Sequence, residues 1–447
     1  MSRKVEDFTS INDNEVKIYT CGPTVYSYAH IGNLLSYIYW DLLVRTLKLD
    51  GYKVERVMNI TDVGHLTSDG DTGEDKLEKG AKQTGLTVWE VAEKYTEAFL
   101  TDMEKINWVK PNQIIKATDC IKEDLELVQR LIDRGYTYET SDGIYFDTSK
   151  FPSYADFARL DIDNLQAGAR VEFNDEKRNV SDFAVWKWVR EGEDHAMQWE
   201  FQGRAGYPGW HLECATIIHN SLGQPIDIHT GGVDHIPVHH TNEIAEAEAA
   251  YDEPLAKVWL HCNHVTSEGM KISKSLGNGY LLSDLEQKGY SALDYRMWAL
   301  QGNYRAERNF SFEDLVAAKN RLQNYRNWVV LRFQTEVGDK SGLRELEKRM
   351  LACLTDNLNS AGALAELDKA SHVLTPDDEF VEFLDQAFGL KLAEIEDIDG
   401  EAKRKIAARE EAKATKDYAT ADAIRDELKE QGVKLEDSAN GVIWQLA

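Results

Sequence analysis

Residues 16 to 33 read Val-Lys-Ile-Tyr-Thr-Cys-Gly-Pro-Thr-Val-Tyr-Ser-Tyr-Ala-His-Ile-Gly-Asn. The short apolar run at 16–19 predicts a buried strand, and Gly22 with the proline after it predicts a turn. The apolar run at 34–49 has the length of a helix. The start of a helix offers free backbone N–H groups and a positive dipole end, which suits a phosphate, and Gly32 would let a ligand approach the backbone closely. A turn that only caps and packs the helix is the alternative.

A second stretch, Met-Lys-Ile-Ser-Lys-Ser-Leu-Gly-Asn at residues 270–278, makes the phosphate interpretation more specific. Together with His-Ile-Gly-Asn at residues 30–33, it resembles the two signature motifs of class I aminoacyl-tRNA synthetases, which are named HIGH and KMSKS. Cys21, just ahead of the first motif, narrows the resemblance to the cysteinyl-tRNA synthetases, and the similarity runs through nearly the whole chain. Taken alone, the second stretch would be an exposed loop of lysines and serines.

Composition limits the class of protein. The chain has 447 residues, 42% of them hydrophobic, which predicts a folded enzyme of about two to four domains. It lacks both a signal peptide and an apolar run of the roughly 18 residues that span a bilayer, so we expect a cytosolic protein without a membrane partner. Five scattered cysteines favour reduced thiols or metal ligands over disulfides. The net charge of −27 argues by itself against nucleic-acid binding, although a basic face can lie on an acidic protein.

The order of the elements predicts a parallel sheet. The first strand, turn and helix, followed by the apolar residues 52–60, form a βαβ unit. The sequence has neither GxGxxG nor GxxxxGK[ST], so a nucleotide must be held in another way. Because ligands of such sheets bind beyond the carboxyl ends of the strands, Cys21 and Thr61 should face one crevice. Further along, we expect a polar loop at 62–85, helices at about 87–106 and 119–134, and a hairpin within 136–146.

We therefore predict an α/β fold, with a Rossmann-like parallel-sheet catalytic domain split by an insertion, then an α-helical bundle and a small C-terminal α+β domain. In the resembled family an insertion stands at this place, and residues 181–187 are similar to its closing segment. The predicted parts are the first half of the catalytic domain at 1–115, the connective insertion at 116–200, the second half at 201–262, the KMSKS loop and stem-contact region at 263–310, the helical bundle at 311–400 and the C-terminal anticodon-recognition domain at 401–447.

Two cysteines and a histidine cluster invite a metal interpretation. His239 and Glu243 are four residues apart, so on a helix they would share a face and could bind one ion with Cys21 and Cys214. The residues alone leave open that the cysteines are buried apolar groups and that the histidines cap a helix or lie on the surface, because no Cys-x-x-Cys pair is present.

The resemblance to the family assigns one zinc ion to Cys21, Cys214, His239 and Glu243. Such an ion could take the sulfur of the substrate as a ligand, whereas a hydroxyl is a harder and less acidic ligand, so zinc would separate cysteine from serine without an editing domain. This chain has Ile-Pro-Val-His-His-Thr-Asn-Glu where the family usually has Phe-Pro-His-His-Glu-Asn-Glu. His235 and His240 therefore stay open as ligands.

The resemblance also implies a reaction. The carboxylate of L-cysteine attacks the α-phosphate of ATP, used with Mg²⁺, pyrophosphate leaves, and cysteine is then transferred to tRNA(Cys). Such a transfer depends on positioning and charge neutralisation. Asn33 departs from HIGH, since it donates a hydrogen bond but cannot be cationic, and we expect activity to survive. The implied roles are catalysis by His30, Asn33, Lys271 and Lys274, ATP binding by His30, Gly32, Asn33 and Lys274, and a cysteine pocket lined by Thr61, Trp210 and His229.

The part after about residue 311 resembles the tRNA-recognition end of the family. The basic residues of the tail lie among acids, so a solvated face is an equal alternative, and Trp444 either stacks on a base or closes a small core. Two other functions stay open: a ligase that joins cysteine to a small amine, as in mycothiol synthesis, and a non-catalytic zinc- and RNA-binding regulator. The C-terminal part argues against the first, and intact His30, Lys271 and Lys274 argue against the second. We expect a monomer.

Overall fold

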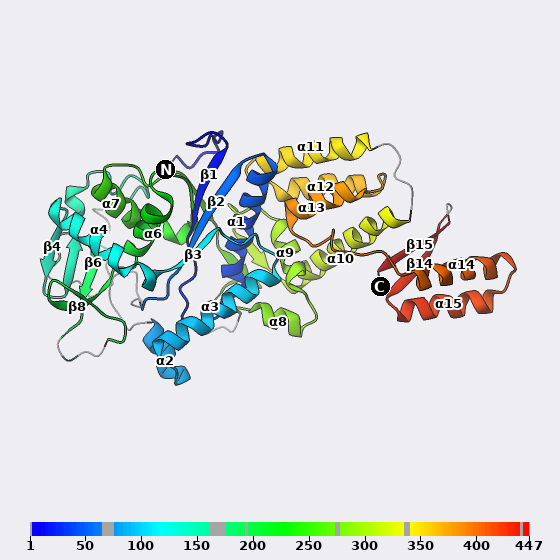
Figure 1. Ribbon diagram of the computed structural model, residues 1–447, viewed down its shortest axis with the longest axis horizontal. Coiled ribbons are helices and arrows are strands. Elements are labelled where there is room, and N and C mark those ends of the chain that lie inside the picture. Colours follow the sequence, from blue (N-terminus) through cyan, green and yellow to red (C-terminus); the bar gives the residue numbers. More distant parts are fainter. Residues whose placement is uncertain are drawn as a thin grey trace.

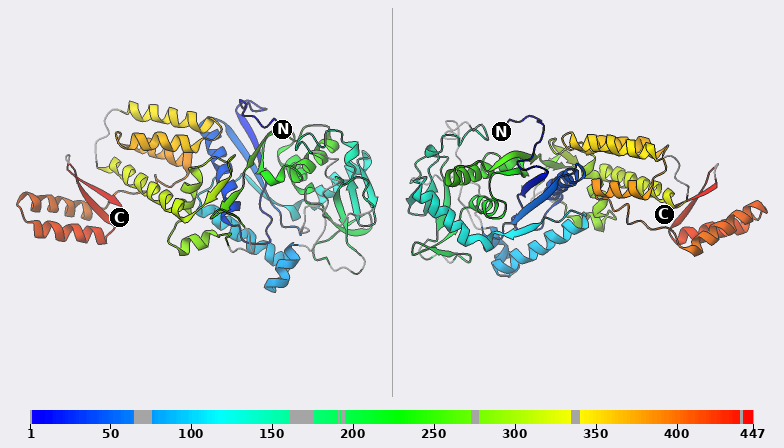
Figure 2. Two further views of the ribbon diagram at one scale, coloured as in Figure 1. Left: turned by 180° about the vertical axis from the view of Figure 1, so that it is seen from behind. Right: turned by 45° about the horizontal axis from the view of Figure 1, so that its top comes forward.

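The structure is a computed structural model that describes residues 2–64, 76–160, 176–190, 192, 195–272, 278–334, 340–438 and 441–446. The molecule is elongated, with an antiparallel sheet at one end, a parallel sheet next to it, then a group of helices, and a small helical and hairpin unit at the other end (Figures 1 and 2). Among the described residues, the structure contains no helix that combines the length and the apolar character needed to cross a membrane.

The parallel sheet confirms the predicted Rossmann-like core. Its strand order is β10-β9-β1-β2-β3, and every pairing is parallel. The inner strand β1 is buried on both faces, which explains its short apolar run. The chain leaves β1 toward β2 on one side and returns to β9 on the other, so a crevice opens where the direction reverses. The strands span Glu15–Thr20 (β1), Lys53–Ile60 (β2), Gln113–Lys116 (β3), Ile226–Gly232 (β9) and Ala256–Cys262 (β10).

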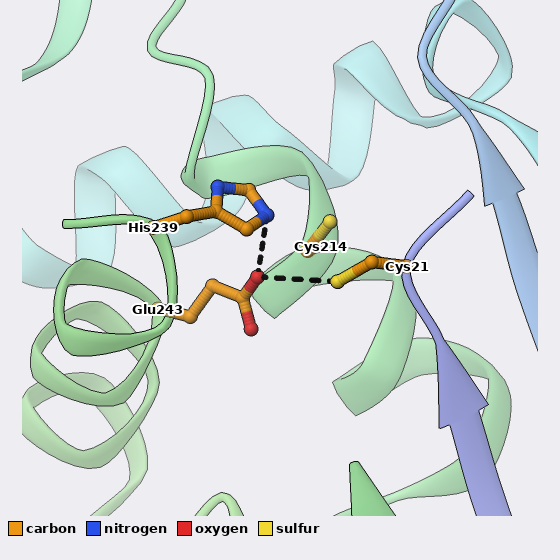
Figure 3. A group of neighbouring side chains, drawn as sticks. All are labelled: Cys21, Cys214, His239 and Glu243. Atoms are coloured by element: carbon orange, nitrogen blue, oxygen red, sulfur yellow. Dashed lines mark hydrogen bonds and ion pairs between the residues drawn. The ribbon is translucent and has the colours of Figure 1, made fainter. Parts of the chain in front are cut away.

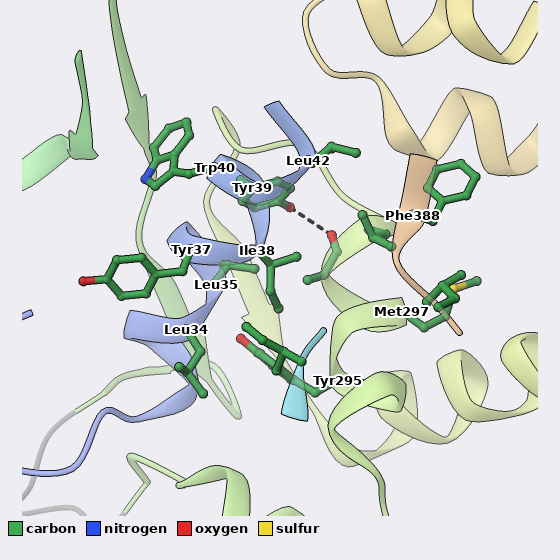
Figure 4. Packing of buried hydrophobic residues seen from close by; sticks show 14 of the residues in the cluster. Leu34, Leu35, Tyr37, Ile38, Tyr39, Trp40, Leu42, Tyr295, Met297 and Phe388 are labelled. Atoms are coloured by element: carbon green, nitrogen blue, oxygen red, sulfur yellow. Dashed lines mark hydrogen bonds between the residues drawn. The ribbon is translucent and has the colours of Figure 1, made fainter. Parts of the chain in front are cut away.

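The helix that links β1 to β2 is α1, Ile31–Leu49, which begins three residues before the predicted start. Most of its side chains are buried, because it lies between the sheet and the helices α9, Ala292–Leu300, and α13, Asp378–Phe388 (Figure 4). Tyr39 of α1 donates a hydrogen bond to the carbonyl of Ala299 at 3.0 Å, and Tyr295 donates one to the carbonyl of Ile31 at 2.6 Å. The apolar residues on every face of α1 are explained by its burial on all sides.

The insertion forms a second, antiparallel sheet in the order β4-β5-β6-β8-β7. The predicted hairpin is confirmed as β4 and β5. This sheet continues past residue 200, the predicted end of the insertion, since β8 runs to Pro208 and pairs with β6. The strands span Thr137–Thr140 (β4), Gly143–Phe146 (β5), Phe183–Trp188 (β6), Trp199–Phe201 (β7) and Arg204–Pro208 (β8), and helix α4, Ile121–Asp133, precedes them.

The prediction of a polar loop at 62–85 is wrong for residues 76–84. Residues Lys76–Thr84 form helix α2, whose Leu77 is buried, and Gly80 lies against Val91 of α3, Val88–Lys105. Tertiary packing against α3 therefore outweighs the polar composition of this stretch. The predicted capping box of α3 is confirmed, because Thr87 Oγ1 accepts from the Glu90 N–H at 3.2 Å and Glu90 accepts from the Thr87 N–H at 2.8 Å.

The C-terminal half is helical, as predicted, and ends in a small separate core. Trp444 is 4% exposed and lies parallel to Phe333, with ring centroids 6.4 Å apart, so it closes that core. The remaining elements are α6 (Leu212–Leu222), α7 (His239–Tyr251), β11 (Val265–Ser267), β12 (Met270–Lys271), α8 (Leu282–Gln287), β13 (Arg308–Phe310), α10 (Phe312–Val329), α11 (Ser341–Thr355), α12 (Ser360–Ser371), α14 (Gly400–Ala414), α15 (Tyr418–Glu430), β14 (Val433–Ser438) and β15 (Gly441–Leu446).

A buried carboxylate on α1 joins distant parts of the chain. Asp41 is fully buried and accepts hydrogen bonds from Arg45 Nε at 2.7 Å, Arg296 Nη2 at 2.5 Å and the Val109 N–H at 2.6 Å. The two guanidinium groups also donate to backbone carbonyls of Ile106, Asn107, Asp385, Gln386 and Phe388. One carboxylate thereby ties α1 to α9, to the end of α3 and to α13.

The environment of Asp41 keeps it ionised. Burial by itself would raise its pKa, but the charges of Arg296 and Arg45 outweigh burial and hold the pKa at about 2. Gly389, directly after α13, has a φ of 62°, and a Cβ there would lie 2.7 Å from Arg45 Nη2. This position therefore needs glycine both for its left-handed backbone and for the approach of the guanidinium.

We predict that Asp41→Asn lowers the free energy of unfolding by about 3–5 kcal/mol, because two buried guanidinium groups lose their anion. Urea unfolding measures this change. The folded pKa lies below the usual value of about 4, so the contribution is complete above pH 4 and is lost as the pH falls through about 2.

The control is Glu15→Gln, which removes an exposed ion pair with Lys53 and should leave the urea midpoint nearly unchanged. Equal midpoints for Asp41→Asn and the control would show that the buried carboxylate does not hold the helices together.

Candidate functional site

A cavity of about 620 Å³ lies at the carboxyl ends of β1, β2 and β9, where the crevice was expected. Cys21 and Thr61 both line it, which confirms the prediction that they face one crevice. Of the predicted site residues, it is also lined by His30, Gly32, Asn33, Trp210, Cys214, His239 and Lys271. Lys274 lies outside the described residues, and the remaining two, His229 and Glu243, lie behind the wall of the cavity.

The turn after β1 is fixed by the neighbouring strand. The Gly22 N–H donates to Asn59 Oδ1 at 2.7 Å, and a Cβ on Gly22 would lie only 1.7 Å from the Asn59 carbonyl oxygen. Asn59 Nδ2 in turn donates to Thr61 Oγ1 at 2.9 Å. Only glycine fits at position 22. The close contact between Gly22 and Asn59 holds Cys21 at the carboxyl end of β1, beside Thr61.

The start of α1 is a reciprocal cap. His30 is the N-cap residue: its Nδ1 accepts from the Asn33 N–H at 3.2 Å, and Asn33 Oδ1 accepts from the His30 N–H at 3.1 Å. Because Nδ1 acts as an acceptor, the proton of a neutral ring is on Nε2, so this imidazole can donate a hydrogen bond. A Cβ on Gly32 would lie 2.9 Å from His30 Cε1, so only glycine at this position leaves room for the His30 ring.

The chain that follows the second signature stretch lies beside the first. The Ile31 N–H donates to the Tyr280 carbonyl at 2.8 Å, directly beyond the second stretch. Asn278 Nδ2 donates to the Lys271 carbonyl at 3.1 Å, which holds together the two ends of the segment that contains Lys274. Tyr280, which follows the second stretch, therefore lies at the cap of α1.

Four ligand atoms of the predicted metal site lie within 4.8 Å of one another: those of Cys21, Cys214, His239 and Glu243 (Figure 3). Cys21 follows β1, Cys214 lies in the first turn of α6, and the other two lie one turn apart at the start of α7. His239 Nε2 is 2.7 Å from Glu243 Oε1, and Cys21 Sγ is 4.0 Å from the same oxygen. All four side chains are buried, and together they could hold a metal ion.

A second set of four uses Cys21, His229, His240 and Glu243. His240 Nε2 is 3.4 Å from Cys21 Sγ, and His229 Nε2 is 2.6 Å from Glu243 Oε2. The two sets share a thiol and a carboxylate. Only the first has members other than Cys21 that line the cavity, so it is the set that a ligand in the cavity could reach. His235, the other open candidate, belongs to neither set.

Charge is balanced tightly within this cluster. Burial would raise the pKa of Glu243, but His229 and His239 hold it well below its usual value. Burial would lower the pKa of His239, but Glu243 raises it to about 10. A hydrogen bond with Cys21, together with burial, raises the pKa of the Cys214 thiol well above its usual value. The raised pKa values mean that Cys214 and His239 hold protons among these donor atoms. A metal ion would replace those protons, which fits a donor set that binds a metal.

The prediction that His229 lines the cysteine pocket is not supported by its position. Its ring is fully buried beside the Glu243 carboxylate and is stacked on Trp259 at a centroid distance of 4.4 Å. The cavity wall beyond β9 is instead formed by His235, which the sequence offered only as a metal ligand, and by Asp234, which sequence reasoning missed. The sequence could have indicated them, because these residues directly follow the Gly-Gly pair that ends β9. They therefore lie at the same carboxyl edge of the sheet that led to the prediction for Cys21 and Thr61.

Comparisons with known proteins agree with this arrangement. Residues 7–320 match the family model described as the tRNA synthetases class I (C) catalytic domain. The chain is 40% identical over 486 residues to the cysteine–tRNA ligase of Treponema denticola, covering 100% of this chain and 98% of the relative. It is 42% identical over 458 residues to cysteine–tRNA ligase 1 of Burkholderia lata, covering 98% and 94%.

Solved structures share the fold. The methionyl-tRNA synthetase of Mycobacterium tuberculosis bound by methionyl-adenylate has a TM-score of 0.59 at 16% identity, covering 85% of this chain and 89% of that one. The LeuRS of Agrobacterium radiobacter, in a ternary complex with tRNA and LeuAMS, has a TM-score of 0.62 at 11% identity, covering 87% and 86%. With the match along its whole length, the chain belongs to the cysteine–tRNA ligase family of class I tRNA synthetases.

Proposed function

We propose that the chain activates L-cysteine with ATP, releases pyrophosphate and transfers the cysteine to tRNA(Cys), with a zinc ion that selects the substrate thiol. The observation that carries this proposal is the group of two thiols, an imidazole and a carboxylate at a cavity whose wall also carries the capped His30. A thiol-binding centre beside a phosphate-binding helix start suits an enzyme that must hold cysteine and ATP together.

The donor set fits zinc. Two sulfurs, one nitrogen and one oxygen match the ligands and the coordination number that zinc takes in proteins. His239 Nδ1 is 2.9 Å from His211 Nδ1, so the nitrogen opposite the proposed ligand atom is held by a second buried ring. Bound there, zinc would supply a soft Lewis acid that prefers the sulfur of cysteine to the hydroxyl of serine.

The residues of the cavity divide the remaining tasks. Thr61 and Trp210 flank the metal ligands and would enclose the substrate side chain, and the Asp234 carboxylate would accept hydrogen bonds from the substrate ammonium group.

His30 Nε2 would donate a hydrogen bond to a phosphate of MgATP, and Asn33 would hold the His30 ring in place. Gly32 leaves the backbone of the helix start open to ATP. Lys271 and Lys274 would neutralise the charge that develops as pyrophosphate leaves.

The small-amine ligase is not favoured. Its discriminating feature was the part of the chain after about residue 311, and the cysteine–tRNA ligase of Treponema denticola matches this chain over its full length. The structure has the helices α10 to α13 and the small unit of α14, α15, β14 and β15 in that part. The predicted domain boundaries, the monomeric state and the cytosolic location stay predictions.

We predict that the purified protein carries about one zinc ion per chain and that Cys214→Ser removes most of it, because a hydroxyl is a poor ligand for zinc. Elemental analysis of the dialysed protein measures this. Cys353→Ser, a partly buried thiol on α11, is the control and should keep its zinc.

The histidines separate the two possible ligand sets. His239→Ala should lose zinc, and His240→Ala should retain more of it. The opposite order would assign the ion to the set of His229 and His240. Full zinc retention by Cys214→Ser would remove the metal from this site altogether.

We predict that Lys274→Ala lowers the rate of cysteine-dependent ATP–pyrophosphate exchange by roughly 10²–10³, with little change in the KM for cysteine, since it removes a charge aimed at the transition state. Lys53→Ala, in an exposed ion pair on β2, is the control and should exchange at the normal rate. An unchanged rate for Lys274→Ala would leave this lysine without a role in activation.

The function itself is tested by pyrophosphate exchange with each of the twenty amino acids, followed by charging of tRNA. We expect exchange with cysteine and far less with serine, then attachment of cysteine to tRNA(Cys). Comparable exchange with serine would contradict the selection of the thiol. Exchange with cysteine, followed by coupling to an amino sugar and never to tRNA, would favour the small-amine ligase.

A further inference from the structure

An exposed aromatic ring lies at the mouth of the catalytic cavity. Tyr28 belongs to the loop between β1 and α1, two residues before His30, and 45% of its surface is exposed. Its ring meets Tyr95 of α3 edge to face, with centroids 4.9 Å apart and an interplanar angle of 90°. Tyr95 and Phe99 continue the aromatic surface along α3 into the cavity. The Tyr28 ring is therefore supported by a second ring while it stays open to solvent.

A lysine lies over these two rings. Lys94 Nζ is 5.8 Å from the centroid of Tyr28 and 5.3 Å from that of Tyr95. Its neighbour Glu93 pairs with Lys116, and Lys94 itself forms no ion pair within the part of the chain that the structure describes. Aromatic faces and an exposed cation thus meet at the rim of the cavity.

We propose that Tyr28 and Lys94 form a stacking platform for the unpaired 3′ end of the tRNA. The inference rests on the proposed function, because the second step requires the terminal ribose of the tRNA to enter this cavity. Unpaired nucleotides are bound by stacking of their bases on aromatic side chains, with basic groups along the phosphates. The open ring provides the stacking surface, and Lys94 provides the charge for the phosphodiester next to the stacked base.

The position of the platform matches this task. Tyr28 precedes His30 in a loop whose far end is fixed by the cap of α1, so the ring and the activation site are held at a constant separation. A base stacked on Tyr28 would therefore set the depth to which the 3′ end enters the cavity. Tyr28 acts on the transfer step as a positioning residue, and cysteine activation does not require it.

Separate assays of the two steps test the platform. For Tyr28→Ala we expect kcat/KM for tRNA charging to fall about tenfold, in line with the loss of one stacked base, and cysteine-dependent pyrophosphate exchange to stay within about twofold of wild type. Tyr28→Phe keeps the ring and should charge normally. Trp89→Ala removes another exposed aromatic residue of α3, outside the cavity lining, and is the matched control.

Direct binding measurements give a second readout. Wild-type protein should bind intact tRNA(Cys) about tenfold more tightly than the same tRNA without its unpaired 3′ nucleotides, and Tyr28→Ala should bind the two with nearly equal affinity. Lys94→Gln should reduce the slope of log affinity against log salt by about one, because one phosphate contact is lost.

The outcomes separate the platform from the proposed function. Equal charging by wild type and Tyr28→Ala would overturn the platform and leave the ligase function standing. A raised KM for ATP in the exchange assay of Tyr28→Ala would also overturn it, since the ring would then hold the adenine of ATP. Failure of the wild type to charge tRNA(Cys) at all would end the proposed function itself.

Discussion

The fully buried carboxylate of Asp41 is the interaction on which the arrangement of the parts depends. A charge in such a place is tolerated only because Arg45 and Arg296 surround it, and these in turn need the backbone carbonyls at the ends of α3 and α13. Removing any one partner leaves the others unsatisfied. The sheet and the helices beyond it therefore pack as one unit, not as two independent bodies.

This constraint reaches the catalytic site through α1. The helix that carries Asp41 in its middle carries His30 at its start, and the same helix is packed against α9 and α13. On the other side of the cavity, α6 and α7 present sulfur, nitrogen and oxygen donors from their first two turns. Both walls of the cavity are thus helix starts held by buried packing. Such positions preserve geometry better than free loops, as a reaction governed by positioning requires.

The sequence was sufficient where one local signal dominated. The apolar runs of β1 and α1, the capping box at Thr87 and the edge that joins Cys21 to Thr61 all follow from spacing and strand order. Other features depend on contacts between distant segments. The helix at Lys76–Thr84 forms because it packs on α3, and the antiparallel sheet extends to Pro208 because β8 pairs with β6. The position of the His229 ring could not be predicted from the sequence, because a histidine at a strand end can face either the cavity or the protein interior.

The cap of α1 explains why a class I synthetase can carry Asn33 in its first motif. In this position the side chain returns to the N–H of His30, so the cap requires a hydrogen-bond acceptor of suitable reach. Histidine with an unprotonated ring nitrogen meets that requirement, and so does the amide of asparagine. In this chain the side chain at the last position of the motif closes the cap of α1. Any side chain that can accept the N–H of residue 30 from this position could therefore complete the same reciprocal cap.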